Sequence, residues 1–274
     1  MPPKVYVPAY PAGDFRAMPA LGADHALLKW VTSFPGNPQR GLPTVTGLAL
    51  LSDASNGALL AALDASAVTA LRTGAAAVLA AETLGCADGP TAVIGAGVNG
   101  EAAAQTFAAR GRDLLLYDVV ASRAAEVAGR VGARVAASRD EALGADVVVT
   151  VTPGREVVFE EGSLRPGQHV SLMGADGPGK QEIAAAELAR VRVFCDDWEQ
   201  ASHNGDLVHG VEAGVILRDD VTELGDVLIG TADGRRSDTD ITIFDSTGLA
   251  IQDLAIALAA MERADQLDLP KIEL

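Results

Sequence analysis

The 274-residue chain has few of the residue types that mark several protein classes. Two cysteines, Cys86 and Cys195, are too few for a disulfide framework, so we expect reduced thiols. The four histidines form no His-x-x-x-His pair or similar cluster, so we expect no metal site. Basic residues are also scarce, because 21 Lys and Arg face 37 Asp and Glu. The resulting net charge of −16 argues against nucleic acid or an anionic membrane as the partner.

Long apolar runs and targeting signals are missing as well. Gly, Asp or Arg interrupts each apolar run before it reaches the length of a membrane span, and no basic segment leads into an apolar stretch at the amino terminus. Hydrophobic residues still make up 49% of the chain, enough for a large core and for two domains. This composition predicts a cytoplasmic enzyme.

The most informative segment present is a glycine-rich turn, Gly95-Ala-Gly97-Val98-Asn99-Gly100, after the apolar run 91–94. Gly95 allows a tight turn, Gly97 lets a pyrophosphate approach the backbone, and Gly100 lets the next helix pack close to the sheet. The first N–H groups of that helix would stabilise an anion. A structural glycine turn is the alternative, but the strand, the helix and a following acid in register favour a dinucleotide site.

Asp118 is that acid. It ends the apolar run 114–117, about 20 residues after Gly95. A carboxylate at this point would accept hydrogen bonds from both hydroxyls of an adenine ribose and would repel a 2′-phosphate. The sequence therefore predicts NAD as the cofactor and disfavours NADP.

Hydrophobic periodicity divides the chain into two domains of an α/β fold. An irregular or extended segment, 2–22, precedes β-suited runs that predict an antiparallel meander, and an alanine-rich helix follows up to residue 84. After Gly89-Pro90, strands and helices alternate, which predicts a doubly wound parallel sheet of the Rossmann type. The runs of the meander are 25–34, 45–51 and 58–63, and the strands of the parallel sheet are 91–95, 113–118, 133–136, 146–151, 167–173, 191–195 and 241–245.

The last long helix, 249–264, is apolar on more than one face, so we place it between the domains or back on the first one. The smaller α+β domain is then discontinuous and comprises residues 1–87 and 248–274. The Rossmann domain comprises residues 88–247.

Seven unusual motifs occur in order along the chain and together resemble the ornithine cyclodeaminase/mu-crystallin family, within it most of all the archaeal-type alanine dehydrogenases. They are Leu28-Lys29-Trp-Val, Phe34-Pro-Gly-Asn-Pro, Gly41-Leu-Pro-Thr44-Val, Leu71-Arg72-Thr-Gly-Ala, Gly95-Ala-Gly97, Gly174-Ala-Asp176-Gly-Pro-Gly-Lys180 and Phe244-Asp245-Ser246-Thr-Gly. The resemblance implies that the smaller domain binds the substrate and forms a homodimer, and that the Rossmann domain binds NAD.

The resemblance also assigns roles to Lys29 and Arg72. Lys29 matches the catalytic lysine, which would polarise a carbonyl or imine oxygen or bind the substrate carboxylate, and a nearby Arg72 would lower its pKa. Without the family match, Lys29 would be read as a surface lysine. Arg72 matches an arginine that bridges the cofactor phosphate and the substrate carboxylate, and an interdomain salt bridge is the alternative.

Asp176 matches the acidic residue that faces the substrate amine, where it would take a proton, although glycines around an Asp also describe an ordinary turn. Asp245 would either orient Lys29 or fix its own loop. The predicted catalytic residues are thus Lys29 and Asp176. The residues that would contact the cofactor are Thr44, Arg72, Gly95, Gly97, Val98, Asn99, Gly100, Asp118, Thr152, Met173, Gly174, Lys180 and Ser246.

Two features depart from the family pattern. The chain starts at Met1-Pro-Pro-Lys4, whereas family members carry several tens of residues before a Pro-Pro-Arg segment, so we expect a shortened first domain. That domain commonly forms the dimer interface in the family, so the mode of association is left open. Lys4 stands where an arginine would bind the substrate carboxylate. A lysine keeps the positive charge but cannot form the two parallel hydrogen bonds that a guanidinium forms with a carboxylate.

The sequence therefore predicts an NAD-dependent oxidoreductase that acts on the α-carbon C–N bond of a small L-amino acid or its imino or keto acid, with alanine and pyruvate as the first pair to test. A reductase of cyclic ketimines, such as pyrroline or piperideine carboxylates, is the nearest alternative. A lyase of the ornithine cyclodeaminase type and a binding protein without turnover are two more.

Overall fold

The computed structural model describes residues 2–86, 89–177 and 179–271. The chain divides into two compact units, the first formed by Met1–Arg72 with Leu249–Leu274 and the second by Thr73–Gly248. The division falls inside one helix, α1 (Ala65–Leu84). The sequence placed it at residues 87–88, which lie outside the described residues. The boundary lies earlier because α1 is continuous and its second half packs against the sheet of unit 2.

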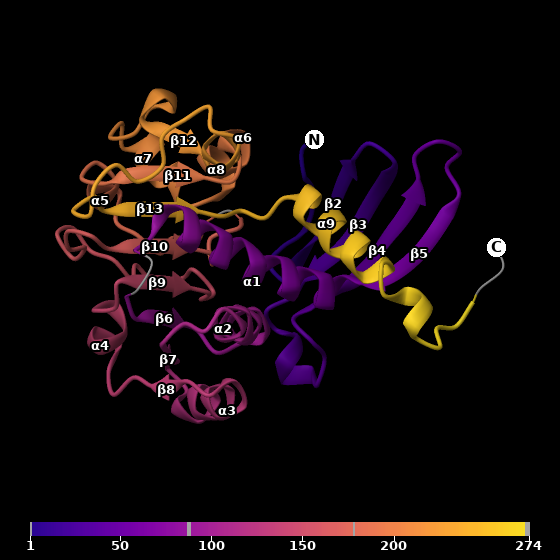
Figure 1. Ribbon diagram of the computed structural model, residues 1–274, viewed down its shortest axis with the longest axis horizontal. Coiled ribbons are helices and arrows are strands. Elements are labelled where there is room, and N and C mark those ends of the chain that lie inside the picture. Colours follow the sequence, from indigo (N-terminus) through magenta and orange to yellow (C-terminus); the bar gives the residue numbers. More distant parts are fainter. Residues whose placement is uncertain (1, 87–88, 178, 272–274) are drawn as a thin grey trace. The chain divides into compact units, whose positions relative to one another are not determined.

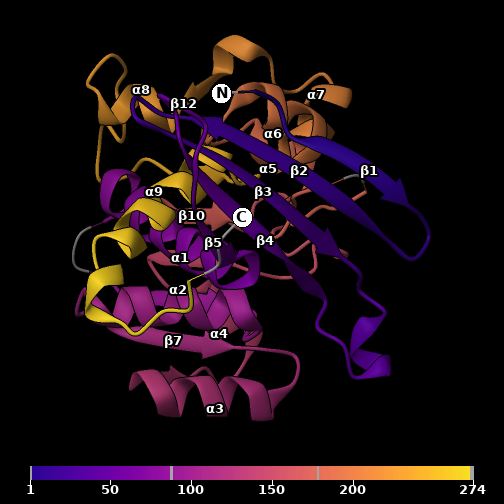
Figure 2. The same ribbon diagram turned by 90° about the vertical axis from the view of Figure 1, so that its right-hand side faces the viewer.

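Unit 1 contains a five-stranded antiparallel sheet in the order β1-β2-β3-β4-β5, seen side by side in Figure 2. The segment 2–22, which we expected to be irregular or extended, forms the hairpin of β1 and β2. A period-two signal was present in β2, because Asp14, Arg16, Met18 and Ala20 are all buried on one face. The strands are β1 (Val5–Ala9), β2 (Gly13–Leu21), β3 (His25–Ser33), β4 (Val45–Asp53) and β5 (Leu59–Asp64).

The last helix, α9 (Ala250–Met261), returns to unit 1 and packs on β2, β3 and β4 (Figure 1). Its buried positions are Ala250, Asp253, Leu254 and Ala257, a spacing that lies on one helical face. The apolar members of this face join Leu27 and Leu51 of the sheet in one hydrophobic cluster. Asp253 is the exception, a carboxylate on the otherwise apolar face.

Unit 2 contains an eight-stranded sheet in the order β12-β11-β13-β10-β9-β6-β7-β8, and every pair in it is parallel. The order reverses between β6 and β9, and open α/β sheets bind ligands at the carboxyl ends of the strands at such a point. The strands are β6 (Thr91–Ile94), β7 (Leu114–Tyr117), β8 (Arg134–Val135), β9 (Val147–Thr150), β10 (His169–Leu172), β11 (Arg192–Cys195), β12 (Val221–Glu223) and β13 (Thr242–Asp245).

The helices of unit 2 follow the prediction up to β11 and then exceed it. The sequence predicts no helix or strand at residues 196–240, whereas the structure has α6, α7, β12 and α8 there. These elements are short, so the periodicity of each is too brief to recognise. The helices are α2 (Val98–Ala109), α3 (Ala121–Val131), α4 (Arg139–Leu143), α5 (Ala185–Leu188), α6 (Trp198–Asn204), α7 (Leu207–Glu212) and α8 (Leu224–Leu228).

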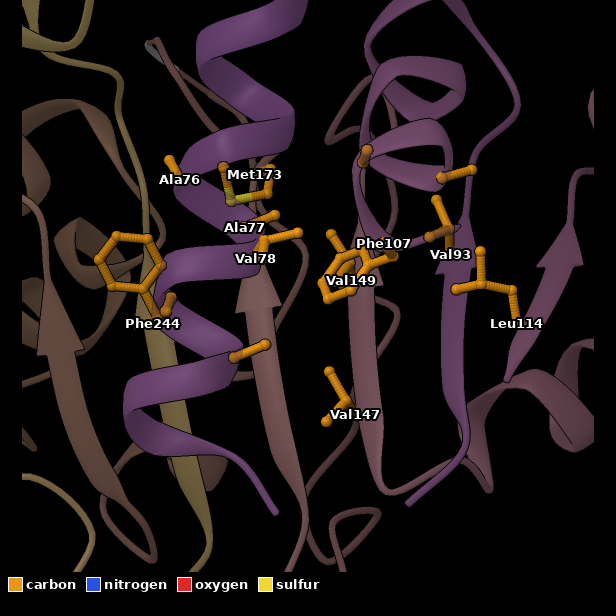
Figure 3. Packing of buried hydrophobic residues seen from close by; sticks show 14 of the residues in the cluster. Ala76, Ala77, Val78, Val93, Phe107, Leu114, Val147, Val149, Met173 and Phe244 are labelled. Atoms are coloured by element: carbon orange, nitrogen blue, oxygen red, sulfur yellow. The ribbon is translucent and has the colours of Figure 1, made fainter. Parts of the chain in front are cut away.

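One face of the parallel sheet is covered by the second half of α1 and by α2 and α3. Figure 3 shows Ala76, Ala77 and Val78 of α1 near Met173 and Phe244, which come from strands β10 and β13 or their ends. Small alanine side chains let the helix approach the strands closely, which explains the alanine enrichment of this segment.

Helix α1 corrects the expectation that no apolar run is long enough to span a membrane. It has 20 residues and, in the part of the chain that the structure describes, is the one helix that passes this test of length and composition. However, 61% of the apolar 18-residue stretch within this helix is buried inside the protein, as in the core helix of a folded domain.

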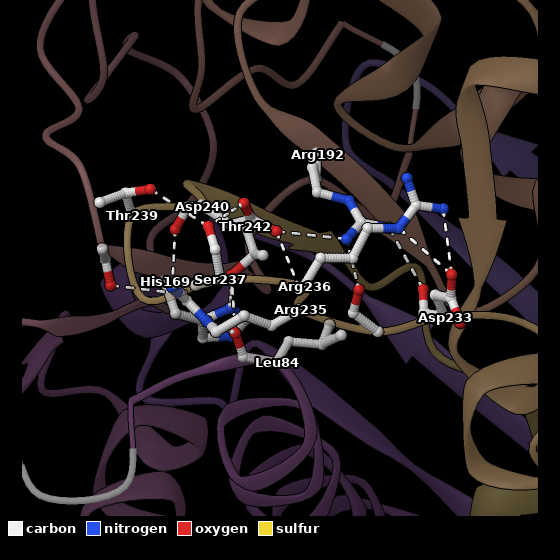
Figure 4. A network of polar contacts seen from close by, with 12 residues as sticks. Leu84, His169, Arg192, Asp233, Arg235, Arg236, Ser237, Thr239, Asp240 and Thr242 are labelled. Carbon is white, nitrogen blue, oxygen red and sulfur yellow. Dashed lines mark hydrogen bonds and ion pairs between the residues drawn. The ribbon is translucent and has the colours of Figure 1, made fainter.

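At the amino-terminal ends of β10 and β13, Arg235 connects several segments of the chain by hydrogen bonds (Figure 4). Its guanidinium donates to the carbonyl oxygens of Leu84 (2.7 Å), Asp240 (2.7 Å) and Gly167 (3.2 Å). His169 lies in the same network, and burial lowers its pKa to about 3, so it is neutral. The network holds the end of α1 against the beginnings of β10 and β13.

Candidate active site

Lys29 projects from β3 onto the face of the sheet that α9 covers, and it is only 1% exposed. Its Nζ lies 2.7 Å from both carboxylate oxygens of Asp253 and 3.1 Å from the Thr69 hydroxyl. A buried ammonium needs such partners because the charge loses its hydration. Lys29 is therefore not the surface lysine that was its alternative interpretation.

Two guanidinium groups lie near this ammonium. Arg72 on α1 places its Nε 3.8 Å from Asp253, and this buried Nε has no hydrogen-bond partner among the described residues. Arg16 on β2 shares a sheet face with Lys29, since Met18 pairs with Lys29, and its Nε donates to Asp14 at 2.6 Å. Three buried cations, Lys29, Arg72 and Arg16, are thus gathered in one part of unit 1.

The pKa of Lys29 is lowered from 10.5 to about 8. The largest cause is desolvation, and the charges of Arg72 and Arg16 act in the same direction, while Asp253 opposes them. Lys29 can therefore exchange a proton near neutrality. Its anchoring carboxylate, Asp253, was not predicted.

Lys4 lies at the edge of the same sheet. Its Nζ stands 5.6 Å from the centre of the Tyr6 ring, and the Arg16 guanidinium stands 5.3 Å from that centre. Tyr6 pairs with Arg16 across β1 and β2. A guanidinium therefore lies beside Lys4 in Arg16, a residue that the sequence analysis does not single out. Thr44 belongs to unit 1 as well and lies half-buried just before β4.

In unit 2, the glycine-rich turn connects β6 to α2. Gly95 has φ +106°, which favours glycine, and a side chain on Gly100 would overlap the Gly95 carbonyl oxygen. A side chain on Gly97 would meet nothing within 4 Å, so there is open space beside it. Gly97 is also the N-cap of α2 and offers no side chain to the first N–H groups. The turn, with Val98 and Asn99 opening the helix, fits a diphosphate.

Asp118 follows β7 directly and approaches the same turn. Its two carboxylate oxygens accept hydrogen bonds from the N–H groups of Ala96 (2.7 Å) and Val120 (2.8 Å). Each oxygen keeps a lone pair for a further donor. The residues present therefore fit an adenosine diphosphate with a free ribose diol.

The ends of β9 and β10 carry three further predicted residues, Thr152, Met173 and Gly174. Buried Glu182 holds two of them together. It accepts hydrogen bonds from the Thr152 hydroxyl (2.6 Å) and the Gly174 N–H (2.9 Å), and also from the Thr150 hydroxyl (2.8 Å). The sequence analysis does not single out Glu182. The available signal was its position, two residues after Lys180 of the glycine-rich loop.

Asp176 and Lys180 lie in one loop and form an ion pair with 2.5 Å between Nζ and Oδ1. Lys180 also donates to the Gly174 carbonyl oxygen at 3.2 Å. Both side chains are about one third exposed, so they are accessible to a ligand.

The structure decides between the two interpretations of Asp245. Its Oδ2 accepts a hydrogen bond from the Leu207 N–H at 3.0 Å, so it fixes a loop of unit 2, and the partner of Lys29 is Asp253. The neighbouring Ser246 hydroxyl donates to Asp196 at 3.2 Å. Among the described residues, no group of three or more His, Cys, Asp or Glu could hold a metal ion.

The predicted residues therefore form two groups, one in each unit. Lys29 and Arg72, joined by Arg16 and Asp253, form a cationic cluster in unit 1. The glycine turn, Asp118 and the ends of β9 and β10 form the second group, at the carboxyl ends of the parallel strands of unit 2.

Comparison with known proteins identifies the family of this chain. A model of the ornithine cyclodeaminase/mu-crystallin family matches residues 1–267. Alanine dehydrogenase from Archaeoglobus fulgidus is 43% identical over 274 residues, covering 96% of this chain and 84% of the relative.

Solved structures of similar proteins also match nearly the whole chain. The dimer of an archaeal alanine dehydrogenase with bound NAD has a TM-score of 0.91 and 41% identity, covering 100% of this chain and 88% of the other. The Δ1-pyrroline-2-carboxylate reductase of Thermococcus litoralis, in complex with NADH and L-proline, has a TM-score of 0.89 and 28% identity, covering 97% and 87%. The chain belongs to the ornithine cyclodeaminase/mu-crystallin family.

Proposed function

We propose that this protein is an NAD-dependent oxidoreductase that acts on the C–N bond at the α-carbon of a small L-amino acid or its imino or keto acid, with alanine and pyruvate as the first pair. The observation that carries the proposal is the buried Arg72 Nε, which lies 3.8 Å from Asp253 and has no hydrogen-bond partner among the described residues. A substrate carboxylate would supply the missing acceptor for this guanidinium.

The residues of unit 1 then bind and polarise the substrate. Arg72 offers its unpartnered Nε to the carboxylate, and Arg16 and Lys4 add positive charge nearby. Lys29 donates a hydrogen bond to the carbonyl or imine group and moves a proton near neutral pH, with its ammonium held in place by Asp253. Asp176 of unit 2 is the second candidate for proton transfer.

Unit 2 binds the coenzyme in this proposal. A bound NAD would supply the acceptor for a hydride from the substrate α-carbon. Gly97 and the start of α2 would hold its diphosphate, and Asp118 would accept hydrogen bonds from the ribose hydroxyls. The fixed carboxylate of Asp118 would repel a 2′-phosphate, which supports NAD over NADP. On the family pattern, Thr44, Thr152 and Ser246 are assigned to the nicotinamide half, and Met173, Gly174 and Lys180 to contacts with the cofactor.

A spectrophotometric screen tests this function. L-amino acids are offered with NAD, and keto acids with ammonia, as well as cyclic ketimines, are offered with NADH. NADH formation from alanine supports the proposal, and turnover of only a cyclic ketimine assigns the reductase function instead. Ammonia release without net NADH assigns a cyclodeaminase. NADH binding without any turnover in the panel would leave only a binding protein.

We also propose that the chain forms a homodimer through the outer face of its five-stranded sheet. This face is apolar and exposed, with Trp30 43%, Leu48 54% and Val5 52% accessible. Phe15 stacks on Trp30 at 5.6 Å, which makes a flat aromatic surface. The archaeal relative of known structure is a dimer. Light scattering should give twice the chain mass, and Leu48→Glu should halve it. A monomeric parent protein would refute this assembly.

A further inference from the structure

Three fully buried carboxyl groups in unit 2 have no part in the proposed chemistry. They belong to Glu182, which follows β10, to Asp206 at the start of α7, and to Asp245 at the end of β13. Burial of three acids near one another is costly unless hydrogen bonds or protons compensate for the lost hydration.

Backbone hydrogen bonds connect the three residues in a chain. Asp206 Oδ1 accepts from the N–H groups of Glu182 (2.5 Å) and Ile183 (3.2 Å). Asp245 Oδ2 accepts from the N–H of Leu207, and a side chain on Gly205 would collide with the Asp245 carboxylate. The carboxylate of Asp245 therefore lies against the backbone on both sides of Asp206.

Each of the two aspartates has one oxygen left over. Asp206 Oδ2 and Asp245 Oδ1 are both buried, and neither has a hydrogen-bond partner in the part of the chain that the structure describes. Two ionised carboxylates in this position would repel each other. A single proton on the pair removes this repulsion, because only one of the two carboxyl groups is then charged.

We propose that Asp206 and Asp245 share one proton in the folded protein, and that this proton allows the carboxyl chain to position, through Glu182, the ends of β9 and β10 that carry Thr152 and Gly174. Only the identity of the ligand at these strand ends rests on the proposed function. The positioning itself needs no coenzyme, so it is tested without one.

The surroundings favour a proton on the aspartate pair. Desolvation raises the pKa of Asp245 well above its usual range, and the acids that face it, Asp206, Asp196 and Glu182, raise it further. Desolvation and Glu182 raise the pKa of Asp206 to about 8. Burial also raises the pKa of the adjacent Cys195 thiol, which stays protonated.

Glu182 differs from the pair in its hydrogen bonds. Burial raises its pKa, but two hydroxyl and two backbone donors favour its ionised form. The negative charge of the chain therefore resides on Glu182, and the proton resides between Asp206 and Asp245.

Carbon-13 NMR of labelled aspartate tests the shared proton directly in the unmodified protein. A buried aspartate carboxyl should remain protonated at pH 7, and Asp245→Asn should lower the number of protonated aspartate carboxyls by one. If every aspartate carboxyl is ionised at pH 7, the proposal is overturned.

Unfolding by urea at several pH values gives a second test. A folded state that keeps one extra proton makes the unfolding constant rise about tenfold for each pH unit between roughly pH 5 and 8. This contribution should disappear in Asp245→Asn and persist in the exposed control Asp219→Asn. Equal slopes in the parent protein and Asp245→Asn would contradict a shared proton.

Hydrogen exchange tests the positioning role. The Gly174 amide donates to Glu182, so its protection factor should fall at least tenfold in Glu182→Gln. It should also fall in the parent protein above the pH at which the shared proton is lost, but not in Asp245→Asn. Protection that is independent of pH in the parent, or unchanged in Glu182→Gln, would show that the acid chain does not position this strand end.

Discussion

Replacing Asp253 with asparagine should change the pH at which this enzyme works. The substitution keeps the shape of the side chain but removes the negative charge 2.7 Å from the Lys29 ammonium. The two guanidinium groups of Arg16 and Arg72 remain. Lys29 then loses the interaction that opposes its desolvation, so its pKa must fall further.

The magnitude follows from the present balance at Lys29. Its pKa of about 8 lies about 2.5 units below 10.5, which corresponds to about 3 kcal/mol in favour of the neutral amine. At pH 7 about 90% of Lys29 is still charged. An adjacent opposite charge shifts a pKa by about 1–3 units, so Asp253→Asn should leave roughly 10% charged at pH 7.

The assay is the rate of NADH oxidation with pyruvate and ammonia between pH 5 and 9. If charged Lys29 polarises the carbonyl, kcat of Asp253→Asn should fall about tenfold at pH 7 and recover toward pH 5. The exposed Asp265→Asn, on the segment after α9, is the matched control and should keep the parent profile. A uniform loss of activity at all pH values would refute the reasoning, because it would indicate structural damage instead of a changed proton equilibrium.

Three further substitutions test other parts of the structure. Lys29→Ala should abolish turnover but leave NADH binding, measured by fluorescence, nearly intact, and retained turnover would remove it from the mechanism. Asp118→Ala should raise KM for NAD more than for NADP, since it removes both the ribose acceptor and the repulsion of a 2′-phosphate; equal changes would contradict the ribose assignment. Arg235→Ala should lower the free energy of unfolding in urea by about 2–4 kcal/mol, because several carbonyl groups lose their donor. A loss below about 1 kcal/mol would mean that water replaces the guanidinium.

The sequence predicts those parts of the site whose signal is local. The turn at Gly95 and Gly100 needs residues without side chains within six positions, and Asp118 follows at a fixed distance, so pattern alone locates them. Lys29 and Arg72 carried a weaker local signal and were assigned through the family resemblance. In the same way, long helices and apolar strands were predicted correctly, whereas the short elements α6, α7 and α8 were not.

The residues that hold the catalytic groups leave no such signal. Asp253 is 224 positions from Lys29, in a helix whose pattern is otherwise apolar, so only the fold brings them together. Glu182 accepts hydrogen bonds from Thr150 and Thr152 across 30 or more positions. The boundary between the units was also misplaced, because Gly89-Pro90 is a strong local signal and the middle of α1 carries none.

The two buried clusters differ in how their charges can be neutralised. Arginine does not lose its proton in proteins, so in unit 1 Arg16 and Arg72 stay charged, whereas Lys29 can lose its charge. The pKa of Lys29 is lowered to about 8, so most of it is charged at neutral pH, and in the proposed function an anionic substrate binds beside the unpartnered Arg72 Nε. In unit 2 the buried groups are acids, and carboxyl groups can bind a proton from water. A proton can therefore neutralise the acid cluster, whereas the arginines need an anionic partner.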